Sequence, residues 1–146
     1  MNHRKNKGKL AARITLGLLF SVFGLNGFLN FIPQPPHGGA AGAFLGALAA
    51  TGYMFPLIKG TELVAGLLLL AGRAVPFALT LLAPVVVNIL AFHLFLEPAS
   101  LALPLLTLAL GLYVAWTERA VYAPLFNTAE PARTSAAAGG HATSAA

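Results

Sequence analysis

The chain of 146 residues has no cysteine and no aspartate, so all four of its acidic residues are glutamate. Without cysteine the chain has no disulfide, no thiolate metal site and no Cys-x-x-Cys redox chemistry. Without aspartate, and with no two histidines three or four residues apart, a metal site is not expected. No Ser-His-acid arrangement and no nucleophile elbow is visible. The familiar soluble hydrolase and metalloenzyme classes are therefore disfavoured.

Charge is also scarce, since only 9% of the residues are charged and 58% are hydrophobic. Average soluble domains are about 25% charged. A chain of this length cannot bury so much apolar surface inside itself. The composition disfavours a soluble enzyme and excludes an intrinsically disordered chain. We expect an integral membrane protein whose main partner is the lipid bilayer.

Four apolar runs are long enough to cross a bilayer, at about 17–25 residues for 30 Å of hydrocarbon. They cover residues 14–32, 55–72, 74–96 and 101–117. Backbone groups must be satisfied inside lipid, so these runs are expected to be helices. The sequence predicts an all-α membrane fold, a four-transmembrane-helix bundle over residues 14–126. A basic cytoplasmic arm, residues 1–13, precedes it, and a disordered cytoplasmic tail, residues 127–146, follows it.

Lysine and arginine lie on one side of this bundle. The arm carries five of them, the link between the second and third runs has Arg73, and the C-terminal side has Arg119 and Arg133. The segments on the other side, residues 33–54 and 97–100, have none. By the positive-inside rule both termini are expected in the cytoplasm. The net charge of +5 follows from this topology and from anionic lipid, so no nucleic-acid partner is expected.

The first outer loop contains a second pattern. Gly38, Gly42 and Gly46 recur every four residues, which predicts a short extra helix over about residues 39–51. Its small-residue face is expected to pack closely against a neighbour. Two placements are open, flat on the outer surface or dipping into the bundle as a lid. His37, just before it, is expected to be solvated.

Polar side chains gather in the outer half of the predicted spans, at depths up to about 12 Å from the outer helix ends. An ionised group in hydrocarbon costs about 2.5–3.5 kcal/mol on insertion scales, so such groups normally face the bundle interior. Lys59 and Glu62 are three residues apart and can pair on one helix face. The simplest packing turns all these groups into one pocket open to the outer side. The candidate ligand-binding residues are Asn26, Asn30, Lys59, Glu62, Asn88, Phe92 and His93.

Each candidate also has a structural interpretation. Lys59 and Glu62 could form an ion pair that only fixes helix register, and Lys59 could snorkel outward. Asn26 and Asn88 could be interhelical hydrogen-bonding groups. His93 lies about 140° from Asn88 around the helix, so both cannot face the pocket squarely. His93 could be an interfacial anchor or a proton-transfer group.

Three stretches carry a resemblance to a known family: Phe23-Gly24-Leu25-Asn26-Gly27, Glu62-x-x-x-Gly66 and the run from Asn88 to His93. Together with the arrangement of the spans, from about Arg13 to Phe126, they resemble the DoxX family. The resemblance implies a four-helix bundle in a bacterial cytoplasmic membrane. Some DoxX members are associated with thiosulfate:quinone oxidoreduction, and others with membrane oxidoreductase assemblies that handle oxidative stress. The absence of cysteine disfavours the thiol chemistry of some relatives.

Two functions remain open, and with them whether the chain is an enzyme. In the first, the chain is a quinone-binding subunit that works with other oxidoreductase subunits. Glu62, the candidate catalytic residue, exchanges protons with the quinone, and Asn26 or Asn88 binds a carbonyl. In the second, a non-catalytic protein binds or transports a small lipophilic molecule, or acts as a scaffold, with self-association or a partner. A conducting channel is disfavoured because the inner half lacks a polar path.

Overall fold

The computed structural model describes residues 2–126, and every regular element in that range is helical. The elements are α1 (Asn2–Leu29), α2 (Gly39–Ala50), α3 (Met54–Ala71), α4 (Val75–Leu96), η1 (Pro98–Ser100), α5 (Ala102–Thr117) and α6 (Arg119–Phe126). Within this part of the chain α1, α3 and α4 are long and apolar enough to cross a membrane, which indicates a membrane protein. The apolar helix α5 is shorter, with 16 residues. The predicted tail, residues 127–146, lies outside the described residues.

Helix α1 differs from the predicted first span at both ends. It begins at Asn2 and so includes the basic arm, and it ends at Leu29 rather than at residue 32. Asn30 ends it by adopting a left-handed backbone conformation, φ +50°, which asparagine tolerates better than most residues. The backbone N–H of Asn30 still donates to the Asn26 carbonyl at 2.8 Å. The chain can therefore turn away from α1 toward α2.

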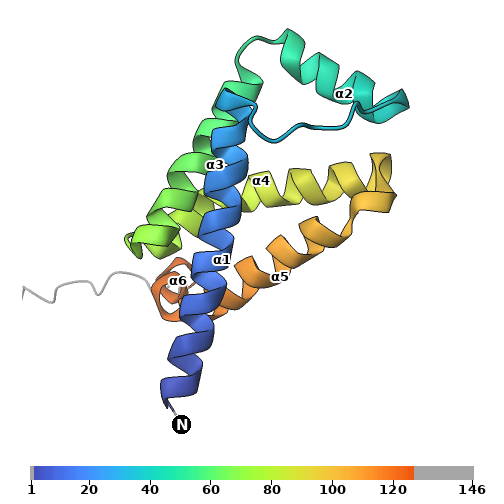
Figure 1. The fold of residues 1–146 in the computed structure, drawn as a ribbon. Coiled ribbons are helices and arrows are strands. Elements are labelled where there is room, and N and C mark those ends of the chain that lie inside the picture. Colours follow the sequence, from blue (N-terminus) through green and yellow to red (C-terminus); the bar gives the residue numbers. More distant parts are fainter. Residues whose placement is uncertain (1, 127–146) are drawn as a thin grey trace, which may run out of the picture.

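The helices form two pairs (Figure 1). α1 and α3 lie side by side, and the hairpin of α4 and α5 leaves them at an angle. The residues of α4 that are buried are confined to its first eight, Val75, Ala78, Leu79 and Leu82. They pack with residues from the middle of α1 and the C-terminal part of α3, including Leu16 and Leu69. The two pairs are therefore joined near α6 and diverge toward α2.

Glycine brings the backbones of α1 and α3 into direct contact. A Cβ on Gly24 would lie 2.6 Å from the Leu63 backbone nitrogen, and one on Gly66 would lie 2.6 Å from that of Ser21. A Cβ on Gly17 would meet Leu70 at 3.0 Å. Small residues are what permits membrane helices to approach this closely. This contact is the most extensive helix pairing in the described part of the fold.

The turn from α3 to α4 depends on a glycine with a positive φ. Gly72 has φ +68°, and the backbone N–H of Arg73 donates to the Leu68 carbonyl at 3.1 Å, which is the Schellman arrangement. A Cβ on Gly72 would collide with the guanidinium of Arg13. That cation therefore lies at the C-terminus of α3, where the helix dipole favours positive charge.

Further contacts hold the helix ends near α6 together. Lys9 of α1 pairs with Glu118 at the end of α5, with 2.7 Å between Nζ and Oε1. The Tyr122 hydroxyl of α6 donates to the Pro76 carbonyl of α4 at 2.7 Å. Burial raises the pKa of Tyr122, so the hydroxyl keeps the proton that it donates. The start of α1, the start of α4 and the end of α5 therefore lie at one end of the molecule.

The glycines of α2 do not form the predicted packing face. No atom lies within 4 Å of a Cβ built on Gly38 or Gly46, and the Cβ of Gly42 would meet only the carbonyl of His37 in the preceding segment. The ring of Phe44 instead packs on Phe92 of α4, with 5.8 Å between centroids. That prediction was wrong because an aromatic contact, and not a glycine seam, holds α2 in place.

The α1–α3 contact makes Gly66→Ala destabilising. Because the new Cβ would meet the Ser21 backbone, the helices must separate, and we expect the free energy of unfolding to fall by about 1–3 kcal/mol. Gly60→Ala on the same helix is the matched control, since no atom lies within 4 Å of its Cβ. Loss of backbone freedom should make that control neutral or stabilising by roughly 0.5–1 kcal/mol. Denaturant unfolding in lipid nanodiscs measures both, and equal effects would contradict the packing.

Candidate functional site

Glu62 is the only acidic residue within the apolar helices of the described range, and it lies beside a base on α3. Lys59 Nζ donates to Glu62 Oε2 at 2.8 Å, which confirms the predicted pairing. The Glu62 side chain is only 2% exposed, whereas that of Lys59 is 25% exposed. Gly27 of α1 leaves room for the Lys59 side chain, because a Cβ there would collide with the lysine Cγ. The close α1–α3 packing therefore fixes the position of the pair.

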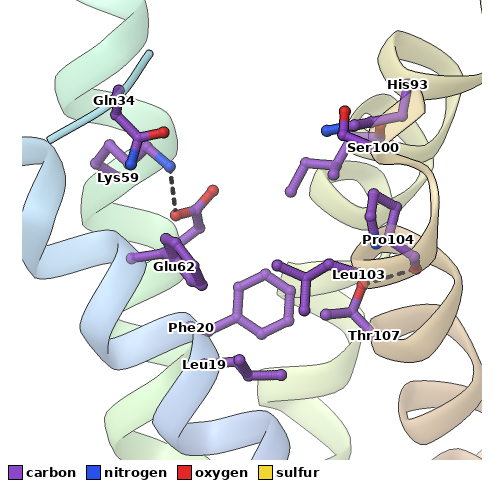
Figure 2. Close-up of a pocket in the computed structure, with 12 residues that line it drawn as sticks. Leu19, Phe20, Gln34, Lys59, Glu62, His93, Ser100, Leu103, Pro104 and Thr107 are labelled. Atoms are coloured by element: carbon purple, nitrogen blue, oxygen red, sulfur yellow. Dashed lines mark hydrogen bonds and ion pairs between the residues drawn. The ribbon is translucent and has the colours of Figure 1, made fainter. Parts of the chain in front are cut away.

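The pair lies on the wall of a cavity of about 340 Å³ between the two helix pairs. The other lining residues are Leu19, Phe20, Phe23, Gln34, Ile89, His93, Ser100, Leu103, Pro104 and Thr107. Figure 2 shows Lys59 and Glu62 on one side, His93 and Ser100 on the other, and Phe20 below the space between them. Gln34, Ser100 and Leu103 are exposed, so the cavity is open to its surroundings. Volumes of about 300–1,000 Å³ are typical of small-molecule sites.

The hydrogen bond of His93 fixes which ring nitrogen is free. Nδ1 lies 2.8 Å from the Ile89 carbonyl oxygen. A carbonyl only accepts, so Nδ1 carries a proton in this arrangement. The neutral ring then has Nε2 as a hydrogen-bond acceptor, which can also take up a proton. The cavity thus has an acceptor on each side, a carboxylate and an imidazole nitrogen.

A second contact joins the segment between α1 and α2 to the end of α4. His37 Nδ1 lies 2.8 Å from Glu97 Oε1, and both side chains are partly buried. The rings of His37 and His93 flank Phe92, with centroids 6.0 and 5.2 Å away. The expectation of a solvated His37 was wrong, because this imidazole bridges segments that are 60 residues apart in the chain.

The asparagines of α1 stabilise the end of that helix. Asn26 is buried, and its side chain accepts from the Ile32 N–H at 2.6 Å and donates to the Ile32 carbonyl at 3.2 Å. Asn30 is exposed and has the left-handed backbone conformation that ends α1. Neither residue lines the cavity, because both serve the turn that follows α1.

Asn88 and Phe92 also lie outside the cavity. Asn88 is exposed, and its Nδ2 donates to the Pro84 carbonyl of its own helix at 3.3 Å. Phe92 is partly buried in the aromatic cluster with His37 and Phe44.

The structure therefore brings together Lys59, Glu62 and His93, and it separates the other four candidates from them. The single pocket predicted for all the polar groups does not form. Its three asparagines face elsewhere, Asn26 and Asn30 toward the turn after α1 and Asn88 away from the helix pairs.

Three polar lining residues were not predicted from the sequence: Gln34, Ser100 and Thr107. Gln34 and Ser100 lie in connecting segments, where depth along a helix gives no information. The Thr107 hydroxyl donates to the Pro104 carbonyl at 2.8 Å, so its polarity is satisfied within α5. Among the described residues no group of three or more His, Cys, Asp or Glu side chains could hold a metal ion.

Comparison with protein-family models, with curated proteins and with solved structures finds no match to this chain. A function must therefore be inferred from the geometry of the cavity.

Removing the base of the pair should destabilise the fold. Lys59→Met leaves the buried Glu62 carboxylate without its partner, and we expect a loss of roughly 1–3 kcal/mol. The double variant Lys59→Met, Glu62→Gln should recover part of the lost stability, because no buried charge remains. Lys9→Met, in a more exposed pair, is the control and should cost under about 1 kcal/mol. Unfolding in nanodiscs measures all three, and no recovery in the double variant would contradict the role of the buried charge.

The bridge between His37 and Glu97 should make stability depend on pH. The hydrogen bond from His37 holds the pKa of Glu97 below its ordinary value of 4.5. A lowered pKa means that the bridge stabilises the fold above that value and stops doing so as pH falls. The melting temperature of the wild type should exceed that of Glu97→Gln at pH 6, and the difference should shrink as the pH falls through the lowered pKa of Glu97. Thr61→Ala, which removes a hydroxyl that bonds only to the Leu57 carbonyl within α3, is the control. A difference that does not change with pH would contradict the bridge.

Proposed function

We propose that the chain is a DoxX-like, four-helix membrane protein whose cavity binds a quinone or quinol. The cavity would serve a membrane oxidoreductase whose redox centre resides in another subunit. The observation that supports this proposal is that the polar groups lie on two sides of an otherwise apolar cavity. A quinol ring has a hydroxyl at each end of an apolar body, and this arrangement matches it.

The membrane placement has its own support. Apart from Lys59, lysine and arginine in the described residues lie toward the end near α6, and the segments between α1 and α3 and between α4 and α5 contain none. α5 begins beside the end of α4 and is followed by α6, which contacts the start of α4. If α4 crosses the bilayer, α5 crosses it too. Both termini are then cytoplasmic by the positive-inside rule, in a bacterial cell membrane.

Each polar residue of the cavity has its own part in binding. Glu62 and the free Nε2 of His93 accept hydrogen bonds from the two hydroxyls of the reduced ring. Both can hold the protons that leave the ring on oxidation, and the two electrons pass to the redox partner. Lys59 offers N–H donors to a carbonyl of the oxidised ring while it neutralises Glu62. Phe20 and Leu103 exclude water from the middle of the site.

Glu62→Gln tests this directly. A neutral amide accepts more weakly than a carboxylate, so we expect the Kd for a short-tail ubiquinol in nanodiscs to rise about tenfold. Glu118→Gln is the matched control, because it breaks a Lys–Glu pair far from the cavity. It should leave the Kd unchanged. Equilibrium dialysis measures each value.

Two outcomes separate this proposal from its alternative, a non-redox protein for lipophilic molecules. Equal ubiquinol binding by wild type and Glu62→Gln would contradict the role proposed for the Glu62 carboxylate. Equal binding of ubiquinol and of an alkyl benzene of the same size would show that only apolar contact matters, which favours the alternative. Retained binding with Glu118→Gln and weaker binding with Glu62→Gln supports the quinol site.

A further inference from the structure

Helix α4 has an outward face that no other part of residues 2–126 covers. Its buried residues lie on one side, and at 100° per residue Asn88 lies on the opposite side. Thr80, Pro84 and Val87 share this outward side and are exposed. Phe95, also on this side, is 78% exposed. The face is therefore largely apolar around one primary amide.

The Asn88 amide is incompletely satisfied within the chain. One Nδ2 hydrogen reaches the Pro84 carbonyl at 3.3 Å. The side-chain oxygen and the second N–H have no partner within residues 2–126. Asn88 is eight residues before Leu96, about 12 Å from that end of α4 and so near the middle of the hydrocarbon. Its short side chain cannot reach the headgroups, and an unpaired amide there is costly.

We propose that this face of α4 binds a second copy of the chain, with the two Asn88 amides hydrogen-bonded to each other. Two copies in one membrane have the same orientation, so their two-fold axis runs along the membrane normal. A residue beside that axis meets its own counterpart at the same depth. A primary amide both donates and accepts, and so it is complementary to itself.

The size of the neighbouring side chains agrees with this contact. Pro84 and Ala91, one turn to either side of the amide, are compact, and so is Thr80 one turn beyond Pro84, while Phe77 and Phe95 lie toward the two ends of the face. Compact residues allow two helices to approach closely enough for short polar side chains to meet. The Thr80 hydroxyl donates to the Pro76 carbonyl of its own helix at 3.0 Å, so its proton is already used.

This inference rests on the proposed membrane placement of α4 but not on ligand binding. The cavity uses Ile89 and His93, which lie on the other side of the same helix. Glu62→Gln should therefore weaken ubiquinol binding and leave dimerisation unchanged. The two proposals can fail independently.

The absence of cysteine makes the test direct, because any introduced thiol is the only one in the chain. Ala91→Cys in native membranes should form a disulfide-linked dimer on addition of copper phenanthroline. Leu106→Cys on α5 is the control, since it is 48% exposed and lies at a similar depth, about 6–8 Å from the outer helix ends. Equal crosslinking at both positions would overturn the proposal.

The amide itself is tested in the Ala91→Cys background. Adding Asn88→Leu should lower the crosslinked fraction about tenfold, whereas Asn88→Gln, which keeps an amide, should retain most of it. A second measure of dimerisation needs no crosslinking. The labelled cysteine-free chain is placed in dilute phosphatidylcholine vesicles, and its photobleaching steps are counted. Dimerisation of Asn88→Leu to the same extent as the wild type would overturn the proposal. Crosslinking of Ala91→Cys to a different protein would also overturn it.

Discussion

The backbone contact between α1 and α3 is the constraint on which the rest of the molecule depends. Gly24 and Gly66 bring the two helices within a distance that no Cβ allows. Because Gly27 has no side chain, the side chain of Lys59 can lie directly against α1 at that position. The buried carboxylate of Glu62 is thereby held at one depth and in one direction. Rigid backbone, and not flexible side chains, positions the charged groups of the site.

The cavity results from how the second helix pair joins the first. The buried residues of α4 lie only among its first eight, at the end near α6, where Lys9 pairs with Glu118 and Tyr122 donates to the Pro76 carbonyl. At the far end, the bridge between His37 and Glu97 joins the segment between α1 and α2 to α4. The helices are therefore connected at both ends and separated between them, which leaves space beside Glu62.

Local features were predicted correctly from the sequence, and features that depend on packing were not. The Lys59–Glu62 pair follows from a spacing of three residues on one helix, and hydropathy alone identified α1, α3 and α4. The orientation of Asn26 and Asn88 depends on which helix face meets a neighbour, which no single segment encodes. The regular glycines of α2 suggested a packing face, yet the less regular ones of α1 form it. Packing is a property of two surfaces, and periodicity describes only one.

The buried pair on α3 also has a consequence for how the protein is made. A charged side chain at the centre of a membrane helix costs about 2.5–3.5 kcal/mol on translocon insertion scales, so α3 is poorly suited to partition into lipid alone. α1 leaves the ribosome first, with the glycine surface that receives Lys59 already available. We therefore expect insertion of α3 to require that α1 is still at the translocon, so that the order of synthesis becomes part of what makes the fold attainable.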